Sequence, residues 1–321
     1  MTELPPVPQP TVDAIWAARE AEARPEYRAF GISASLLGRE CDRQLWYELR
    51  WASPMEIFNG RKLRIFERGN IEEDRVIADL RRAGLDVLDV DPDTGLQWRF
   101  SLAEDWLRGK ADGRATGFRE APKADHVIEI KSLKAADFRA IVKHGLLKAK
   151  PEHWHQLHAG MAGLGINRGA YIGVNKDTEE IWIERVHFDQ EEANRQEARV
   201  LRIVADEAGP GRISDKPDSF ACRFCNHRAL CHGETLHAEQ SCRTCVHFTF
   251  TRDGAGQCAR FGWALTPAEQ TDGGGSCPAH LFLPGLVNGE QIDADPDRET
   301  ITYQLPDGSE WIDGGHREGS K

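Results

Sequence analysis

Residues 126–132, with the sequence HVIEIKS, constrain the fold of this chain more than any other segment. Successive side chains of an extended strand point to opposite faces, so Glu129 and Lys131 would share one face while Ile128 and Ile130 occupy the other. Because the flanking residues are apolar, we expect this strand to be buried, and a buried acid and base require partners. A surface strand with a cross-strand charge pattern is the alternative. The segment therefore predicts an internal strand that carries two ionisable groups.

The order of helical and extended patterns predicts an α/β fold with a mixed central sheet flanked by helices. Helices are expected at residues 12–23, 63–83, 135–145, 151–164 and 190–208. A further helix is expected to begin at Ser33 or Ser35 and to run through Leu45 and Trp46. Strands are expected at residues 85–90, 96–101, 110–117, 126–132, 170–175 and 180–188.

An acidic residue precedes the internal strand at a distance that suits a neighbouring strand. Asp112 lies in the segment GKADG, seventeen residues before Glu129. Two adjacent strands would bring Asp112, Glu129 and Lys131 together. Phosphodiester hydrolysis needs hard oxygen ligands for a divalent metal and a positive group that orients the attacking water. This trio therefore predicts a hydrolytic metal site, and a turn at Asp112 is the structural alternative.

Asp112, the Glu129-x-Lys131 motif and a later Gln156 on a predicted helix resemble the motif series of the PD-(D/E)xK nuclease superfamily. Its RecB-like branch contains phage-type exonucleases and CRISPR-associated exonucleases with iron–sulfur clusters. The resemblance covers residues 31–235. The chain departs from the pattern at Ala111, where the family's eponymous proline would stand.

The resemblance implies a role for each of these residues. Asp112, Glu129 and the Ile130 carbonyl would bind Mg²⁺ or Mn²⁺. Lys131 would activate the attacking water and stabilise the developing charge. Gln156 would orient groups near the metal or the DNA. Many family members have a tyrosine one turn after this glutamine, and here that position is Gly160.

The family also carries an acidic residue on a preceding helix, shortly after a glycine. The segment RGNIEED offers Glu72 and Glu73. Helical spacing places Glu73 on the face of Val76, Ile77 and Leu80, and Glu72 on the polar face of Arg75 and Asp79. We therefore expect Glu73 to point inward and to complete the metal site. A solvated pair of glutamates is the alternative.

Composition and charge indicate a chain of the cytoplasm. Residues 1–16 are proline-rich and lack a signal pattern, and no apolar run is long enough to span a bilayer, so no membrane partner is expected. The net charge of −11 counts mildly against nucleic acid. A basic stripe nevertheless predicts either a phosphate-binding surface or a solvated helix face, and it consists of Lys131, Lys134, Arg139, Lys143, His144, Lys148 and Lys150.

The eight cysteines are expected to be reduced in the cytoplasm, so their clustering favours metal binding over disulfides. Cys222, Cys225 and Cys231 form a C-x₂-C-x₅-C set, and Cys41 is the distant cysteine left to complete it. Four thiolates can hold a [4Fe–4S] cluster or a zinc ion. Spacing alone is compatible with zinc, whereas the nuclease resemblance implies the iron–sulfur cluster. For Cys41 alone, a free buried thiol is the alternative.

A second set of cysteines predicts a small zinc site. The set comprises Cys242, Cys245, Cys258 and Cys277, with His247 and His280 as nearby substitutes. We accordingly divide the chain into a leader (1–30), a nuclease domain closed by the cluster (31–235), a zinc-ribbon-like module (236–286) and a β-hairpin tail (287–321).

The predicted activity is that of a Mg²⁺- or Mn²⁺-dependent DNA exonuclease in recombination, repair or phage replication. The implied partners are single-stranded or duplex DNA ends and a recombination or replication protein. A DNA-processing endonuclease and a non-catalytic DNA-binding adaptor remain the alternatives.

Overall fold

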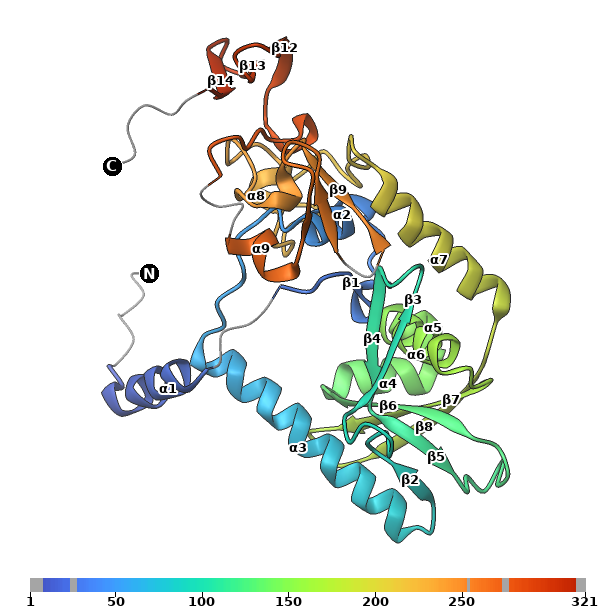
Figure 1. The fold of residues 1–321 in the computed structure, drawn as a ribbon. Coiled ribbons are helices and arrows are strands. Elements are labelled where there is room, and N and C mark those ends of the chain that lie inside the picture. Colours follow the sequence, from blue (N-terminus) through green and yellow to red (C-terminus); the bar gives the residue numbers. More distant parts are fainter. Residues whose placement is uncertain (1–7, 24–27, 253–254, 273–276, 316–321) are drawn as a thin grey trace.

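A five-stranded mixed sheet forms the centre of the computed structural model, which describes residues 8–23, 28–252, 255–272 and 277–315 (Figure 1). Its strands, in spatial order, are β2 (Asp86–Leu88), β5 (Gly113–Thr116), β6 (His126–Leu133), β7 (Arg168–Asn175) and β8 (Ile181–His187). β6 and β7 run parallel, and the other neighbours are antiparallel. The predicted mixed α/β architecture is therefore present.

Helices cover both faces of this sheet. The long helix α3 (Gly60–Arg82) packs against the face that carries Ile128 and Ile130. The opposite face, with Val127 and Tyr171, packs against α4 (Ala135–His144), α5 (Leu146–Ala149) and α6 (Pro151–Leu164). The alternation of residues 126–132 thus has the predicted consequence: the isoleucines enter one packed layer, and Glu129 and Lys131 face the other way.

A second, three-stranded sheet lies beside the first. It has the order β1-β4-β3, with β1 (Ile32–Ser33), β4 (Leu107–Ala111) and β3 (Trp98–Leu102). Only Asp112 separates β4 from β5, so the chain passes from one sheet to the other at this residue. Helix α6 contacts β3 and β4 as well as β6 and β7, and so bridges the two sheets.

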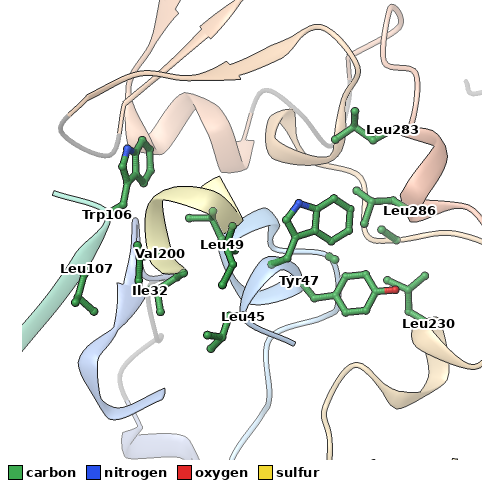
Figure 2. Close-up of a cluster of buried hydrophobic side chains, with 14 of the residues drawn as sticks. Ile32, Leu45, Tyr47, Leu49, Trp106, Leu107, Val200, Leu230, Leu283 and Leu286 are labelled. Carbon is green, nitrogen blue, oxygen red and sulfur yellow. The ribbon is translucent and has the colours of Figure 1, made fainter. Parts of the chain in front are cut away.

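The C-terminal part shares a hydrophobic core with earlier elements. Figure 2 shows Leu45 and Leu49 of α2 (Asp42–Arg50) in the same cluster as Val200 of α7 (Gln190–Ala205) and, further along the chain, Leu283 and Leu286. Residues beyond 236 therefore pack on elements from the earlier part of the chain. The remaining elements are α8 (Arg228–Cys231), η2 (Cys242–Thr244), β9 (Phe248–Phe250), β10 (Gly256–Cys258), β11 (Trp263–Leu265), α9 (Pro267–Asp272), η5 (Pro284–Leu286), β12 (Glu290–Asp295), β13 (Thr300–Gln304) and β14 (Glu310–Gly314).

Two expectations need correction. The helix expected from Ser33 through Trp46 is broken into η1 (Ala34–Leu36) and α2, because the connection passes very close to α6: a Cβ on Gly38 would lie 2.2 Å from the Cα of Glu152. The tail forms a three-stranded sheet, β12-β13-β14, rather than a hairpin.

Helix α1 (Pro10–Glu22) packs against α3, where Glu20 accepts a hydrogen bond from the Gly60 amide. No helix in the described ranges is long and apolar enough to cross a membrane.

Candidate active site

Asp112 is fixed at the junction between the two sheets. Its Oδ2 accepts a hydrogen bond from the Ile130 amide, with an N–O distance of 2.7 Å. The next residue must be small, because a Cβ on Gly113 would lie 2.9 Å from the Leu88 carbonyl oxygen and 3.1 Å from Cδ1 of Ile128. This close packing holds the Asp112 carboxylate against the middle of β6.

The Ile130 carbonyl lies on the same side of β6 as Asp112. The pairing of β5 with β6 ends at Ile128, one residue before Glu129. In an extended strand the amide and carbonyl of one residue point to the same side. Since the Ile130 amide binds Asp112, its carbonyl also faces the space beyond the end of β5. The structure therefore brings this predicted ligand next to the predicted carboxylate ligand.

Glu129 and Lys131 form an ion pair on the face of β6 that is turned away from α3. The Glu129 side chain is almost completely buried, with 1% of its surface exposed. The Lys131 ammonium contacts Glu129 Oε1 and lies 3.9 Å from Asp112 Oδ2. Two carboxylates that were predicted from the sequence thus lie beside the ammonium group of the third predicted residue, Lys131.

Glu73 and Gln156 reach the same place from the flanking helices. Both line an open cavity of about 840 Å³, together with Asp112 and Lys131. Glu73 is on α3 and Gln156 is on α6, so the cavity lies where these helices meet the junction of the sheets.

Glu72, the alternative to Glu73, lies elsewhere. The expectation that Glu72 occupies an exposed polar face is wrong, because only 7% of it is exposed. Its carboxylate is 3.8 Å from the guanidinium of Arg75, which is itself paired with Glu179. Glu72 is thus the more buried of the two glutamates, whereas Glu73 is the one that lines the cavity.

The electrostatics of the cluster are dominated by excess negative charge. Burial raises the pKa of Glu129 to about 8, against the opposing effect of the Lys131 ammonium and with a further increase from Asp112. Burial, followed by repulsion from Asp112, raises the pKa of Glu73 to about 7. Burial would lower the pKa of Lys131, but Glu129 and Asp112 outweigh it and raise that pKa above its usual value. Lys131 therefore stays charged, and the carboxylates compete for protons.

This donor set suits a hard divalent cation, because it consists of carboxylates with more negative charge than one ammonium can balance. No group of three or more His, Cys, Asp or Glu side chains converges as metal ligands in the described part of the chain. In the cluster, the Lys131 ammonium contacts Glu129 and approaches Asp112 instead. The roles of these residues as metal ligands stay predictions.

His153 and Tyr171 support the cluster and were not anticipated from the sequence. Tyr171 lies directly opposite Glu129 in the β6–β7 register. His153 Nδ1 lies 2.9 Å from the Tyr171 hydroxyl, and the two rings stack. Burial and then the charge of Lys131 lower the pKa of His153 to about 3, so this imidazole is neutral at physiological pH.

All three histidines of α6 are partly or fully buried. His158 is buried between the rings of Trp154 and Phe188 and accepts a hydrogen bond from the Asp189 amide. His155 lies 3.3 Å from Glu192. These side chains pack around α6, because this helix is enclosed by both sheets and by α7.

Cations from the second sheet face the cavity. Arg99, Arg108 and Lys110 are among its lining residues. Arg99 and Lys110 are directly opposite each other on β3 and β4 and are both exposed. Like charges in this position destabilise a sheet unless a counter-charge is present. The alternation in LQWRFS and LRGKA is the signal that sequence reasoning missed.

The predicted basic stripe between residues 134 and 150 lies away from these cations. Of the seven residues in the predicted stripe, Lys131 lines the cavity, and those from Lys134 to Lys150 do not. Lys150 is within 3.3 Å of Asp137 and 3.8 Å of Glu152. The position of these residues therefore favours the interpretation of the stripe as a solvated helix face.

The first set of cysteines is brought together from distant parts of the chain. Cys41, at the start of α2, lines one small cavity with Cys222, Cys225 and Cys231. Burial, followed by other contributions that include the neighbouring cysteines, raises the pKa of the Cys225 thiol. Three arginines line the same cavity: Arg43, Arg212 and Arg228.

The second set is also assembled. Cys242, Cys245, Cys258 and Cys277 line another small cavity, as do His247 and His280. Burial and then Cys245 raise the pKa of Cys242 to about 11. His280 Nε2 lies 3.1 Å from the Ser241 carbonyl and 3.2 Å from the Thr244 hydroxyl, so this ring has structural contacts of its own. The identity of any metal at either set stays a prediction.

Comparison with known proteins gives distant structural similarities. No protein-family model matches the chain, and no curated protein matches it. The alkaline exonuclease LHK-Exo from Laribacter hongkongensis is 19% identical, with a TM-score of 0.39 over 60% of this chain and 91% of that chain. Its complex with dAMP gives 20% identity and a TM-score of 0.40 over the same shares. A protein named SSO0001 is 15% identical, with a TM-score of 0.38 over 69% of this chain and 96% of its own.

Proposed function

We propose that this chain is a DNA nuclease of the PD-(D/E)xK type that uses Mg²⁺ or Mn²⁺ and acts at strand ends. The observation that carries the proposal is that Glu73, Asp112 and Lys131 line one open cavity, while the Lys131 ammonium also contacts the buried carboxylate of Glu129. A structural salt bridge has no need of three carboxylates around one ammonium, two of which have raised pKa values.

The ligands of the metal would be Asp112, Glu129 and the Ile130 carbonyl, with Glu73 completing the site. When bound, a divalent cation polarises the phosphoryl group and lowers the pKa of a water molecule. Carboxylate and carbonyl oxygens are the donors that such cations prefer.

The remaining chemistry falls to side chains of the cavity. Lys131 holds its proton, so its ammonium can stabilise charge that develops on the phosphate oxygens. Gln156, on α6, offers an amide that can orient the water or the phosphate.

The polymeric substrate would be held by the second sheet. Arg99, Arg108 and Lys110 line the cavity and carry positive charge to the mouth of the site. A phosphate backbone that lies over Arg99 and Lys110 would relieve the repulsion between these two opposed cations. Cations are thus concentrated at the cavity although the net charge of the whole chain is negative.

For the cysteine sets we propose a [4Fe–4S] cluster at Cys41, Cys222, Cys225 and Cys231, and Zn²⁺ at Cys242, Cys245, Cys258 and Cys277. The arginines around the first set would balance the negative charge of a thiolate-ligated cluster. Both groups would be structural, because hydrolysis requires no electron transfer. Anaerobic purification followed by an absorption spectrum and metal analysis tests both assignments.

We also propose that the enzyme works in the cytoplasm with a recombination or replication protein, in recombination, repair or phage replication. These biological assignments follow from the sequence resemblance.

The activity test compares end-labelled linear DNA with closed circular DNA, in the presence of Mg²⁺ or Mn²⁺. The wild type should degrade the linear DNA, and Asp112→Asn and Lys131→Ala should each lose at least about 100-fold in rate. Lys148→Ala, an exposed cation on α5 outside the cavity, is the matched control and should retain activity. Cleavage of closed circles would favour the endonuclease, and binding without cleavage by the wild type would favour the adaptor.

A further inference from the structure

Three exposed side chains beside the first cysteine set form what we call the aromatic finger: Phe220, Arg223 and Phe224. Phe220 is 83% exposed and Phe224 is 80% exposed. The guanidinium carbon of Arg223 lies 5.0 Å from the centre of the Phe220 ring and 4.8 Å from that of Phe224. Two phenylalanines so exposed contribute almost nothing to the core, so their packing within the chain does not explain them.

The finger belongs to the loop that carries the cysteines. Arg223 and Phe224 lie between Cys222 and Cys225, whose side chains turn inward to line the cysteine cavity. The same short loop thus presents thiols on one side and an aromatic–cationic surface on the other. A metal or cluster bound by the thiols would hold this surface in place.

A groove leads from the finger to the active site. Asn226 and His227 follow the finger directly and line a groove of about 280 Å³, which also has Trp51 and Phe58 in its walls. This groove shares Ala29, Gly31 and Ser33 with the active-site cavity. The two spaces are therefore adjacent, and the groove extends to the two residues that follow the finger in the chain.

The charge of this region favours an anionic partner. Arg223 has no ion pair with an acidic side chain among those found in the described residues. Residues 211–228 contain four Arg and Lys against two Asp, in a chain whose net charge is −11. The acidic side chains of the groove are engaged: Glu48 lies 3.2 Å from His227, and Glu56 is paired with Lys62.

We propose that the aromatic finger binds single-stranded DNA by stacking its rings on nucleobases, on a strand whose end lies in the active site. The inference rests on the proposed nuclease function. Aromatic rings stack on any base, and arginine adds charge and stacking, so such a surface binds single strands with little sequence preference. The finger thereby assigns the enzyme a single-stranded substrate, or a duplex with a single-stranded overhang.

The test measures binding apart from cleavage. The affinity for a labelled single strand is measured by fluorescence anisotropy in proteins that carry Asp112→Asn. The double substitution Phe220→Ala/Phe224→Ala should lower this affinity by about 5- to 150-fold for each lost stack. Trp263→Ala removes an exposed aromatic side chain of the C-terminal module and serves as the matched control, with no change expected. Metal content and thermal midpoint verify that the cysteine loop is intact in each variant.

A positional readout uses oligonucleotides with 2-aminopurine at successive positions from the end. Stacking should quench its fluorescence at one or two positions some nucleotides from the end in the parent protein, and not in the double variant. Unchanged affinity and quenching would overturn the proposal and leave the finger as a surface for a protein. A parent protein that neither binds DNA nor, with Asp112 restored, cleaves it would instead refute the nuclease function itself.

Discussion

Mn²⁺ is expected to bind the metal-free protein much more tightly as the pH rises, because it must displace protons from Glu73 and Glu129. Both carboxyls have raised pKa values, about 7 and about 8. Below its pKa each group is mainly protonated, and a protonated carboxyl is a poor metal ligand. The affinity should therefore rise through this range and become level at higher pH.

The size of the effect follows from the two pKa values. If the cation binds only the form in which both groups are ionised, its affinity falls about 20-fold from pH 9 to pH 7. From pH 9 to pH 6 it falls about 1000-fold. Glu129→Gln leaves only the Glu73 proton, so over the same ranges the decrease should be about 2-fold and about 10-fold.

Isothermal titration calorimetry with Mn²⁺, repeated in buffers of different ionisation enthalpy, measures both the affinity and the protons released. Between one and two protons should be released at pH 7, where both groups are partly protonated. Affinity that is constant between pH 6 and pH 9, with no proton release, would refute the reasoning. Asp112→Asn serves as a check, because it should weaken binding at every pH.

Three further predictions concern residues around the candidate site and the stability of the fold. Arg99→Ala/Lys110→Ala should lower the salt dependence of DNA binding by about two units of log–log slope, yet leave the thermal midpoint equal or higher, since two opposed cations are removed. In denaturant titrations, Gly113→Ala should destabilise the fold by about 1–3 kcal/mol, and it should also reduce cleavage. Gly69→Ala is the control: its new Cβ would meet no atom within 4 Å, so it should be neutral or stabilise the fold by up to about 1 kcal/mol. The free energy of unfolding of the metal-free protein should decrease as the pH rises from about 4.5 to 8, because the folded state binds more protons in this range than the unfolded state. A free energy of unfolding that increases over this range would contradict the raised pKa values.

Much of the candidate site could be predicted because its residues follow local rules. The period of two in residues 126–132 determines which face Glu129 and Lys131 occupy, whatever the rest of the fold does. Cysteines that are close together in the sequence also line one cavity in each of the two sets. Even the distant Cys41 could be assigned by elimination, and it does line the cavity of the first set.

Other features depend on tertiary contacts that no local pattern encodes. The break of the expected helix near Gly38 results from the approach of α6, which lies more than a hundred residues further along the chain. Arg99 and Lys110 face the cavity only because β3 and β4 pair in one register. The burial of His158 likewise depends on Phe188, whose position follows from the complete fold.

The position of Asp112 between two sheets makes the candidate site dependent on both sheets. The β3–β4 turn is held by contacts with the C-terminal part: Trp106 packs on Phe250 with ring centres 4.9 Å apart, and Glu104 lies 3.1 Å from Arg252. A chain with one sheet formed and the other absent has no complete site. Under the proposed nuclease function, an incompletely folded polypeptide would therefore cut no DNA, and the ability to cut would arise only when the last of these elements has folded.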